Sequence, residues 1–223
     1  VAGYKTKGFT PMHLSVMDGG LDMVEYIYYM SLNYGGMEVF LADTTGKVNL
    51  LSGSQPQLDG LKLSENGKKA AYLDTDANTG DTILVEIELG KEKAETVATN
   101  VQSFGYIGNT LIYYFDYTEG VGTLGAAGSK TTIANASGVQ FTEDAVYYVA
   151  DADAATGNGE LRAWDGKTET AIAKDVFAFQ YKENGKLVYI GKYDVNAGVG
   201  DLYYYDGKEA RKLDTGITAI FIY

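Results

Sequence analysis

The 223-residue chain contains no cysteine, only two prolines and a single histidine, His13. Without cysteine there is no disulfide framework and no thiolate metal site, and both reducing and oxidising compartments fit. His13 stands beside Met12 and Leu14, which predicts a packed or surface side chain rather than a ligand. Nothing like a nucleophile elbow accompanies it, so the sequence argues against a triad hydrolase.

Basic residues and targeting signals are also scarce. Lysine and arginine total 18 against 30 aspartates and glutamates, which gives a formal net charge of −12. Repulsion from this charge disfavours nucleic acids and anionic membrane surfaces as partners. The sequence shows no signal peptide, lipidation motif or apolar run of about 18 residues. Because it opens at Val1 rather than Met, we expect that an upstream segment is missing.

Glycine and tyrosine are abundant instead, with 28 and 19 residues, and aromatic residues make up 13%. This composition suits many short strands joined by tight turns. Only Gly20 to Met30 has plausible helical spacing, and its cluster of Val, Ile and Tyr favours a strand. The chain is therefore predicted to be all-β.

A pattern ending in a Gly-containing turn recurs five times along the chain. The aligned positions are Val39, Ile83, Leu124, Leu161 and Leu202. Successive copies are about 44, 41, 37 and 41 residues apart, a spacing that matches one four-stranded β-propeller blade per copy. Aromatic residues at equivalent places, such as Trp164 and the Tyr147-Tyr148 pair, are expected to pack between the blades.

The last copy shows the expected blade most clearly. Its strands are predicted at residues 176–181, 186–193, 201–205 and 210–213. Asn184-Gly185 and Asp206-Gly207 supply tight hairpin turns, because Asn, Asp and Gly tolerate positive φ. Turn signals stand at the corresponding places of the other copies.

We therefore predict a single-domain β-propeller, residues 1–223, of about five four-stranded antiparallel blades. The repeats are expected at about 9–53, 57–100, 101–137, 138–175 and 176–216. The apolar segment 217–223 matches the first strands of the repeats, and an unpaired strand would expose a row of backbone donors. We expect it to close the ring as the inner strand of the first blade. The alternative is that residues 9–16 occupy that place.

The repeats carry a family resemblance. It rests on LSENGKKAAYLD at residues 63–74, IAKDVFAFQYKENGKLVYI at 172–190 and GDLYYYDGKEARKL at 200–213. These motifs resemble WD-repeat-related and TolB-like propeller repeats. They are also similar to uncharacterised bacterial surface proteins in which a zinc-ribbon head and one membrane helix precede a propeller. The resemblance spans the chain from about residue 37, although Leu124 to Ala127 lacks the tyrosines of the neighbouring copies. It implies an extracellular or cell-surface location, with membrane attachment only through an upstream anchor.

Acidic residues gather in the connections between the second and third strands of the repeats. These linkers lie at residues 74–81, 116–119, 151–160 and 194–201. In an up-and-down blade they emerge on the same face as the blade-to-blade connections, with the tight Gly turns opposite. Loops on such a face can vary while the strands hold them, so we expect ligand contacts there. The candidates are Tyr117, Asp175 and Asp194, and the expected partner is a protein, peptide or glycan.

Two linkers carry closely spaced oxygen ligands of the kind that Ca²⁺ prefers. The candidate metal ligands are Asp74, Asp76 and Asn78 in one linker and Asp151, Asp153 and Glu160 in the other. Gly80 stands one place late for an EF-hand and no Glu closes that loop. Solvated turns explain the same residues, so the prediction is no cofactor, with calcium as the alternative.

The sequence therefore favours a non-catalytic binding or scaffold propeller, since no catalytic motif is found. A calcium-stabilised carbohydrate-binding propeller is the second hypothesis, in which Tyr117 contacts the sugar. A glycoside hydrolase is the third, because propellers can hold carboxylate pairs at the channel mouth. Only Asp59 and Asp175 fall near that mouth by repeat position.

Overall fold

The computed structural model describes residues 14–19, 24–33, 36–43, 48–52, 57–89, 91 and 93–221, with side chains described from residue 60 onward. Within these ranges the chain forms eighteen β-strands and no helix, as the composition predicts. Accordingly, the described residues include no helix long and apolar enough to span a membrane. The chain divides into two compact units, an N-terminal unit of residues 1–111 and a C-terminal unit of residues 112–223.

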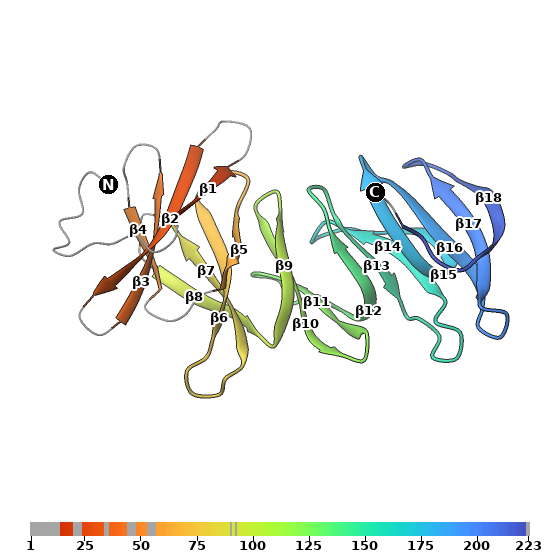
Figure 1. The fold of residues 1–223 in the computed structure, drawn as a ribbon, viewed down its shortest axis with the longest axis horizontal. Helices are drawn as coiled ribbons and strands as arrows, with labels where there is room; N and C mark the ends of the chain where they lie inside the picture. The colour runs from red at the N-terminus through yellow and green to blue at the C-terminus, as the bar shows by residue number, and fades with distance from the viewer. Residues whose placement is uncertain are drawn as a thin grey trace. The chain divides into compact units, whose positions relative to one another are not determined.

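The N-terminal unit contains two four-stranded antiparallel sheets whose strands follow chain order (Figure 1). The first consists of β1 (Leu14–Gly19), β2 (Val24–Asn33), β3 (Gly36–Asp43) and β4 (Val48–Ser52). The second consists of β5 (Gln57–Leu63), β6 (Lys69–Thr75), β7 (Thr82–Glu88) and β8 (Lys93–Thr99). Each sheet matches one predicted repeat.

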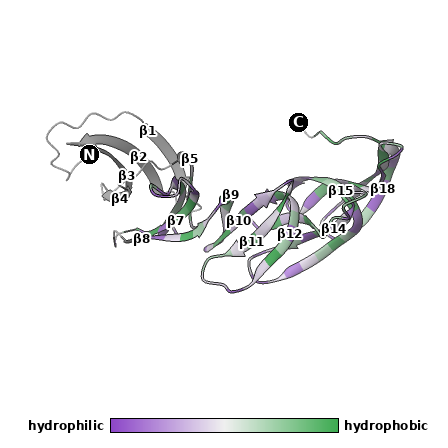
Figure 2. Ribbon diagram, turned by 90° about the horizontal axis from the view of Figure 1, so that it is seen from below, coloured by the Kyte–Doolittle hydropathy of each residue, from purple (hydrophilic) through white to green (hydrophobic). Residues whose placement is uncertain are grey.

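The remaining strands form one ten-stranded antiparallel sheet, again in chain order. They are β9 (Val101–Ile107), β10 (Thr110–Thr118), β11 (Val121–Ala126), β12 (Thr132–Phe141), β13 (Val146–Ala150), β14 (Gly159–Trp164), β15 (Glu169–Glu183), β16 (Lys186–Asp194), β17 (Val199–Tyr205) and β18 (Ala210–Ile217). Figure 2 shows hydrophobic and hydrophilic residues interspersed along these strands, as expected of sheets that bury side chains on their faces.

Two long strands explain why three predicted repeats share one sheet. The first part of β15 pairs with β14 and its second part, from Val176, pairs with β16. β12 is divided in the same way between β11 and β13. We call the segments 14–52, 57–99, 101–135, 136–175 and 176–217 repeats 1 to 5. The all-β antiparallel prediction is confirmed.

A residue in the left-handed backbone region marks the end of each described repeat from the second onward. These residues are Asn100, Asn135, Asp175 and Gly216, with φ of 54°, 55°, 54° and 72°. Asn, Asp and Gly are the residue types that adopt this conformation at least cost. At Asn100, Asn135 and Asp175 the chain therefore passes from the last strand of one repeat to the first strand of the next through the same backbone conformation.

The predicted ring closure is not formed. β18 ends at Ile217, residues 218–221 belong to no strand, and residues 222–223 lie outside the described ranges. The inner place of the first sheet is taken by β1, which pairs with β2 from Leu14↔Tyr29 to Gly19↔Val24. The physical reason is that β1 already satisfies the backbone donors of β2. The single-domain organisation remains a prediction.

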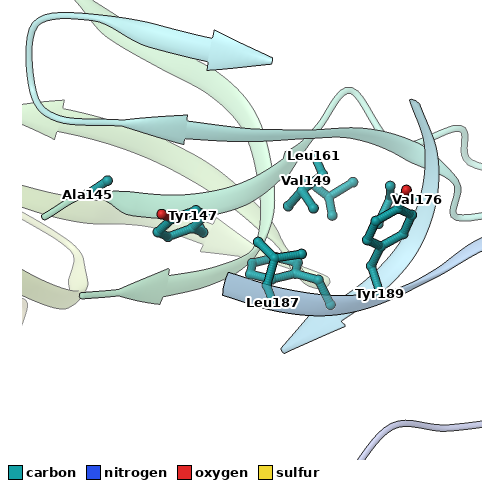
Figure 3. Close-up of a cluster of buried hydrophobic side chains, with 8 residues drawn as sticks. Ala145, Tyr147, Val149, Leu161, Val176, Leu187 and Tyr189 are labelled. Carbon is teal, nitrogen blue, oxygen red and sulfur yellow. The ribbon is translucent and has the colours of Figure 1, made fainter. Parts of the chain in front are cut away.

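Repeats 4 and 5 pack against each other through a cluster of buried side chains (Figure 3). The cluster consists of Ala145, Tyr147, Val149, Leu161, Val176, Phe179, Leu187 and Tyr189. Tyr189 stacks on Tyr203, with ring centroids 4.9 Å apart. Trp164 is 2% exposed, so it packs inside the repeats as predicted.

Repeat 3 keeps its third strand paired on both sides despite the glycines of that strand, with one register shift in each pairing. β11 pairs with β10 and β12 along its length. A Cβ added at Gly122 would lie 2.7 Å from the Tyr114 ring, and one added at Gly125 would lie 2.7 Å from the Tyr113 ring. Glycine in β11 therefore leaves room for the tyrosines of β10. This compensation explains the missing tyrosines.

Candidate ligand-binding face

Three of the acidic linkers fold into the same turn. Each begins with an Asp whose Oδ1 accepts hydrogen bonds from the backbone N–H groups two and three residues later, at 2.8–3.2 Å. The N–H of the Gly four residues later donates to the carbonyl of that Asp. The pairs are Asp76 and Gly80, Asp153 and Gly157, and Asp194 and Gly198. Those glycines have φ of 77°, 71° and 70°, so the sequence Asp-x-x-x-Gly specifies the turn.

The charges of Asp76 and Asp153 are stabilised locally. Hydrogen bonds from the backbone N–H groups of Asn78 and Thr79 lower the pKa of Asp76 below its ordinary value. Hydrogen bonds from the backbone N–H and hydroxyl of Thr156, and from the N–H of Ala155, lower the pKa of Asp153. Each carboxylate is thus engaged by its own turn.

The first group of predicted calcium ligands is divided between the sheet and the loop. Asp74 is 2% exposed in β6, and its Oδ1 accepts from the N–H of Thr75 at 2.8 Å. Asp76 begins the turn, and the side chain of Asn78 is exposed. Asp74 therefore belongs to the buried part of β6, whereas the other two belong to the loop.

The second group is divided as well. Asp151 Oδ1 accepts from Asn135 Nδ2 at 3.2 Å, and Asp153 is occupied by its own turn. Glu160 forms an ion pair with Arg162, which also pairs with Glu169. Across the described side chains, no three His, Cys, Asp or Glu residues come together so as to hold a metal ion. Calcium binding by these two groups of residues remains a prediction.

Contacts between loops show that two kinds of connection share one end of the C-terminal unit. The N–H of Asp151, in the linker of repeat 4, donates to the carbonyl of Asn135, the residue that joins repeats 3 and 4. At the other end of the strands, a Cβ on Gly207 would lie 3.7 Å from the carbonyl oxygen of Asn184, so the two tight turns of repeat 5 adjoin. We call these the loop end and the turn end.

The predicted ligand residues all lie at the loop end. Tyr117 is 46% exposed, and its ring meets that of Tyr114 edge-on at 5.8 Å. The Tyr114 hydroxyl donates to the carbonyl of Ala136 at 2.8 Å, and burial raises its pKa to about 12. Asp175 is exposed at the junction of repeats 4 and 5, and Asp194 begins the linker of repeat 5.

An aromatic pair that the sequence analysis missed stands between the linkers of repeats 4 and 5. The rings of Phe177 and Tyr193 stack in parallel, with centroids 3.9 Å apart and an interplanar angle of 8°. Gly157 lies so close that an added Cβ would be 3.0 Å from the Phe177 ring. Asn158 fixes the backbone of Tyr193, because its Nδ2 donates to the Tyr193 carbonyl at 2.9 Å and its Oδ1 accepts from the Tyr193 N–H at 3.1 Å. We call these four residues the aromatic cluster.

The repeat alignment held a signal for Phe177. The position next after the start of each inner strand is Gln102 in repeat 3, Ser137 in repeat 4 and Thr218 after repeat 5. Phe177 alone is aromatic in that column, and its side chain is 36% exposed. An exposed aromatic residue where these three copies are polar is the signal by which the sequence could have singled out Phe177.

Exposed large hydrophobic side chains are concentrated at the loop end. The described residues include six of them: Tyr117, Val121, Phe177, Val195, Leu213 and Phe221. Tyr117 and Val195 belong to linkers, Val121 begins β11 shortly after a linker, and Phe177 follows the junction of repeats 4 and 5, so all four lie at the loop end. They are interspersed with carboxylates in the sequence, so this end combines apolar and acidic groups.

The structure describes the side chain of only one of the residues considered for catalysis. Asp175 is exposed, whereas the side chain of Asp59 and all of His13 lie outside the described part of the chain. The described side chains of the C-terminal unit include one concentrated charge network, formed by Arg162 with Glu160 and Glu169. The absence of catalytic activity therefore remains a prediction from the sequence.

No protein-family model and no curated protein matches this chain. Among solved structures, the β-propeller domain of the trilobed protease from Pyrococcus furiosus is 13% identical with a TM-score of 0.51, and the match covers 90% of this chain and 71% of that one. The fold is that of a β-propeller domain. An acylaminoacyl peptidase from Pyrococcus horikoshii is 12% identical with a TM-score of 0.50, over 90% of this chain and 39% of that one.

TolB from Acinetobacter baumannii also matches, at 13% identity over 86% of this chain and 52% of that one. Its TM-score of 0.41 is too low to support a shared fold. At these identities the propeller matches show the fold alone. They agree at that level with the resemblance to propeller repeats. The chain spans 39% of the length of the peptidase, so the activity of that whole enzyme is not transferred to it.

Proposed function

We propose that this propeller is a non-catalytic binding module that holds a peptide or protein segment at its loop end. The observation that carries the proposal is the aromatic cluster together with Tyr117, Val121 and Val195, which are exposed in or beside acidic linkers. Interface hot spots are enriched in aromatic residues held rigidly by their surroundings. Asn158 and Gly157 give Phe177 and Tyr193 that support.

The charge of the chain specifies the partner further. The net charge is −12, and Asp175 and Asp194 stand two residues before Phe177 and one after Tyr193 in the sequence. A complementary segment carries Lys or Arg beside apolar side chains, because opposite charges accelerate encounter and like charges are costly. Basic residues can also stack on exposed aromatic rings. The proposed setting is the bacterial cell surface.

The experiment uses an array of peptides that vary independently in basic and aromatic content, probed with the full chain. We expect binding to peptides that contain both, with affinity falling as salt is raised, since exposed charges are screened. Phe177→Ala should lose most of that binding. Leu213→Ala is the matched control, because Leu213 is 51% exposed on β18 outside the loop-end linkers. Equal loss in both variants, or binding that Phe177→Ala leaves intact, contradicts the proposal.

Glycan binding is the second candidate, supported by the half-exposed ring of Tyr117. Sugars stack on such rings without needing a basic group. A glycan array distinguishes the two candidates, because glycan binding should fail in Tyr117→Ala and persist at high salt. If calcium supports it, the melting temperature must rise with Ca²⁺ relative to chelator, as for any ligand of the native state.

A further inference from the structure

The chain contains three Asn-Gly dipeptides, Asn66-Gly67, Asn158-Gly159 and Asn184-Gly185. Glycine after asparagine leaves the following backbone nitrogen unhindered. That nitrogen can attack the side-chain Cγ, so a new C–N bond forms, the amide C–N bond breaks and ammonia leaves. Water then opens the cyclic imide to aspartate or isoaspartate. The reaction requires a free Asn side chain and a backbone that can rearrange, so the folded structure decides which site reacts.

Two of these sites lie in the same tetrapeptide, Glu-Asn-Gly-Lys, at the same position of repeats 2 and 5. Both occupy the first tight turn of the repeat, after the inner strand. Their local sequence contribution to the reaction rate is therefore closely matched. Any difference in the folded protein comes from the surroundings of the turn.

In repeat 2 the asparagine is held on several sides. Asn66 Oδ1 accepts from the Ser64 hydroxyl and from the N–H of Lys68, both at 3.0 Å. Its own N–H donates to Asn109 Oδ1 at 3.0 Å, in the corresponding turn of repeat 3. The N–H of Gly67, the attacking nitrogen, donates to the carbonyl of Ser64 at 2.8 Å. The turn must break these bonds before the ring can close.

The second site is held even more firmly. Both ends of the Asn158 amide bond to the backbone of Tyr193, at 2.9 and 3.1 Å. Gly159 begins β14, where an added Cβ would lie 2.4 Å from the Ala150 carbonyl oxygen. Neither the amide nor the attacking nitrogen can move without opening the aromatic cluster.

The third site has much less support. Asn184 is exposed with φ of 49°, and its side chain has no hydrogen-bond partner among the described residues. The N–H of Gly185 donates only to the Tyr181 hydroxyl, at 3.3 Å. Position 182 is Lys, so repeat 5 lacks the hydroxyl that Ser64 supplies in repeat 2.

We propose that Asn184 is the site of spontaneous deamidation of the native protein, and that the fold protects Asn66 and Asn158. The product adds negative charge, and in part an extra backbone methylene, to the turn between β15 and β16. This site is at the turn end, away from the aromatic cluster. The inference is therefore independent of the proposed binding function.

The test is incubation of the folded full chain at mildly alkaline pH, followed by acidic digestion and mass spectrometry of the three Asn-Gly peptides. We expect conversion at Asn184 at least about tenfold faster than at Asn66, because opening the Asn66 turn costs several hydrogen bonds. In concentrated denaturant the two identical tetrapeptides should react at closely similar rates. Comparable native rates at Asn66 and Asn184 overturn the proposal.

A variant gives a second test that does not depend on Asn184 itself. Ser64→Ala removes one bond to the Asn66 side chain without changing the tetrapeptide. It should accelerate native conversion at Asn66 and leave the rate at Asn184 unchanged. If Asn66 stays as slow in a folded Ser64→Ala protein with altered turn contacts, hydrogen bonding is not what protects it and the explanation fails. Circular dichroism and melting temperature establish that the variant is folded.

Discussion

Repeats 4 and 5 follow the same four-strand plan, yet equivalent residues are buried to different degrees. Leu161 and Leu202 hold the same place in β14 and β17. Leu161 is 0% exposed inside the cluster between the two repeats, whereas Leu202 is half-buried. Tyr203 and Tyr205 of β17 pack against that cluster, so Leu202, at the alternate position, faces away from repeat 4. A blade thus holds only half of each core, and the neighbouring blade completes it.

The largest effect is expected where the two repeats meet. Leu161→Ala should lower the free energy of unfolding by about 3 kcal/mol, because it opens a cavity in a closed cluster. Leu202→Ala, the same change at the equivalent position, should cost about 1 kcal/mol, since less area returns to water. Urea unfolding of the full chain measures both. Equal losses would mean that Leu202 is as fully covered in solution as Leu161.

Hydrogen bonds from one glutamine side chain also join repeats 4 and 5. Gln140 of β12 reaches from repeat 4 to the backbone of β15, where Nε2 donates to the Phe179 carbonyl and Oε1 accepts from the Tyr181 N–H, both at 3.0 Å. Gln140→Leu should cost about 2 kcal/mol, because two partly buried backbone groups lose their partner. Gln180→Leu is the matched control, since Gln180 is exposed and the structure shows no side-chain bond for it among the described residues. A similar loss of unfolding free energy in both variants would show that the hydrogen bonds of Gln140 do not stabilise the contact between the repeats.

The sequence was sufficient to predict an all-β antiparallel fold because the strands and turns carry their own local signals. Glycine, asparagine and aspartate at positive φ specify where strands end, and the spacing of these residues gives the blade length. The buried places of Trp164 and Tyr148 followed from repetition of aromatic residues in equivalent strands. These inferences need only residues close together in the chain.

The failures concern contacts between distant segments. The expected closure required knowing which segment pairs with β2, and the sequence offered two apolar candidates of similar quality. Phe177 was missed because its role depends on its contacts with Tyr193 in β16 and Gly157 in the linker of repeat 4, which are distant from it in the sequence. The carboxylates of the linkers have a spacing in the sequence that resembles the spacing of metal ligands. In three dimensions their own backbone N–H groups occupy Asp76 and Asp153.

Substitutions of Asp175 test whether the junction between repeats 4 and 5 requires a residue with positive φ. Asp175 has φ of 54° between repeats 4 and 5. Asp175→Val should destabilise the chain by about 1–2 kcal/mol, because a β-branched residue is strained in the left-handed region. Asp175→Gly should be close to neutral, since glycine adopts this conformation freely. If the valine variant unfolds at the same denaturant concentration as the glycine variant, the junction tolerates another conformation.

The smallest expected effect is the pH dependence of the stability that Asp153 contributes in the linker of repeat 4 and Asp76 contributes in the linker of repeat 2. The folded-state pKa of Asp153 is lowered from 3.8 by hydrogen bonds from Thr156 and Ala155, so its contribution to stability is present above that value. It is lost as the pH falls through the lower pKa of the folded state. Asp153→Ala should therefore be less stable than the unmodified chain near neutral pH, and the difference should shrink in acid. Asp76→Ala, which removes the same turn from repeat 2, should show the same trend. Urea unfolding at a series of pH values measures both, and a difference that stays constant into strong acid would show that the charge of Asp153 contributes nothing to the turn.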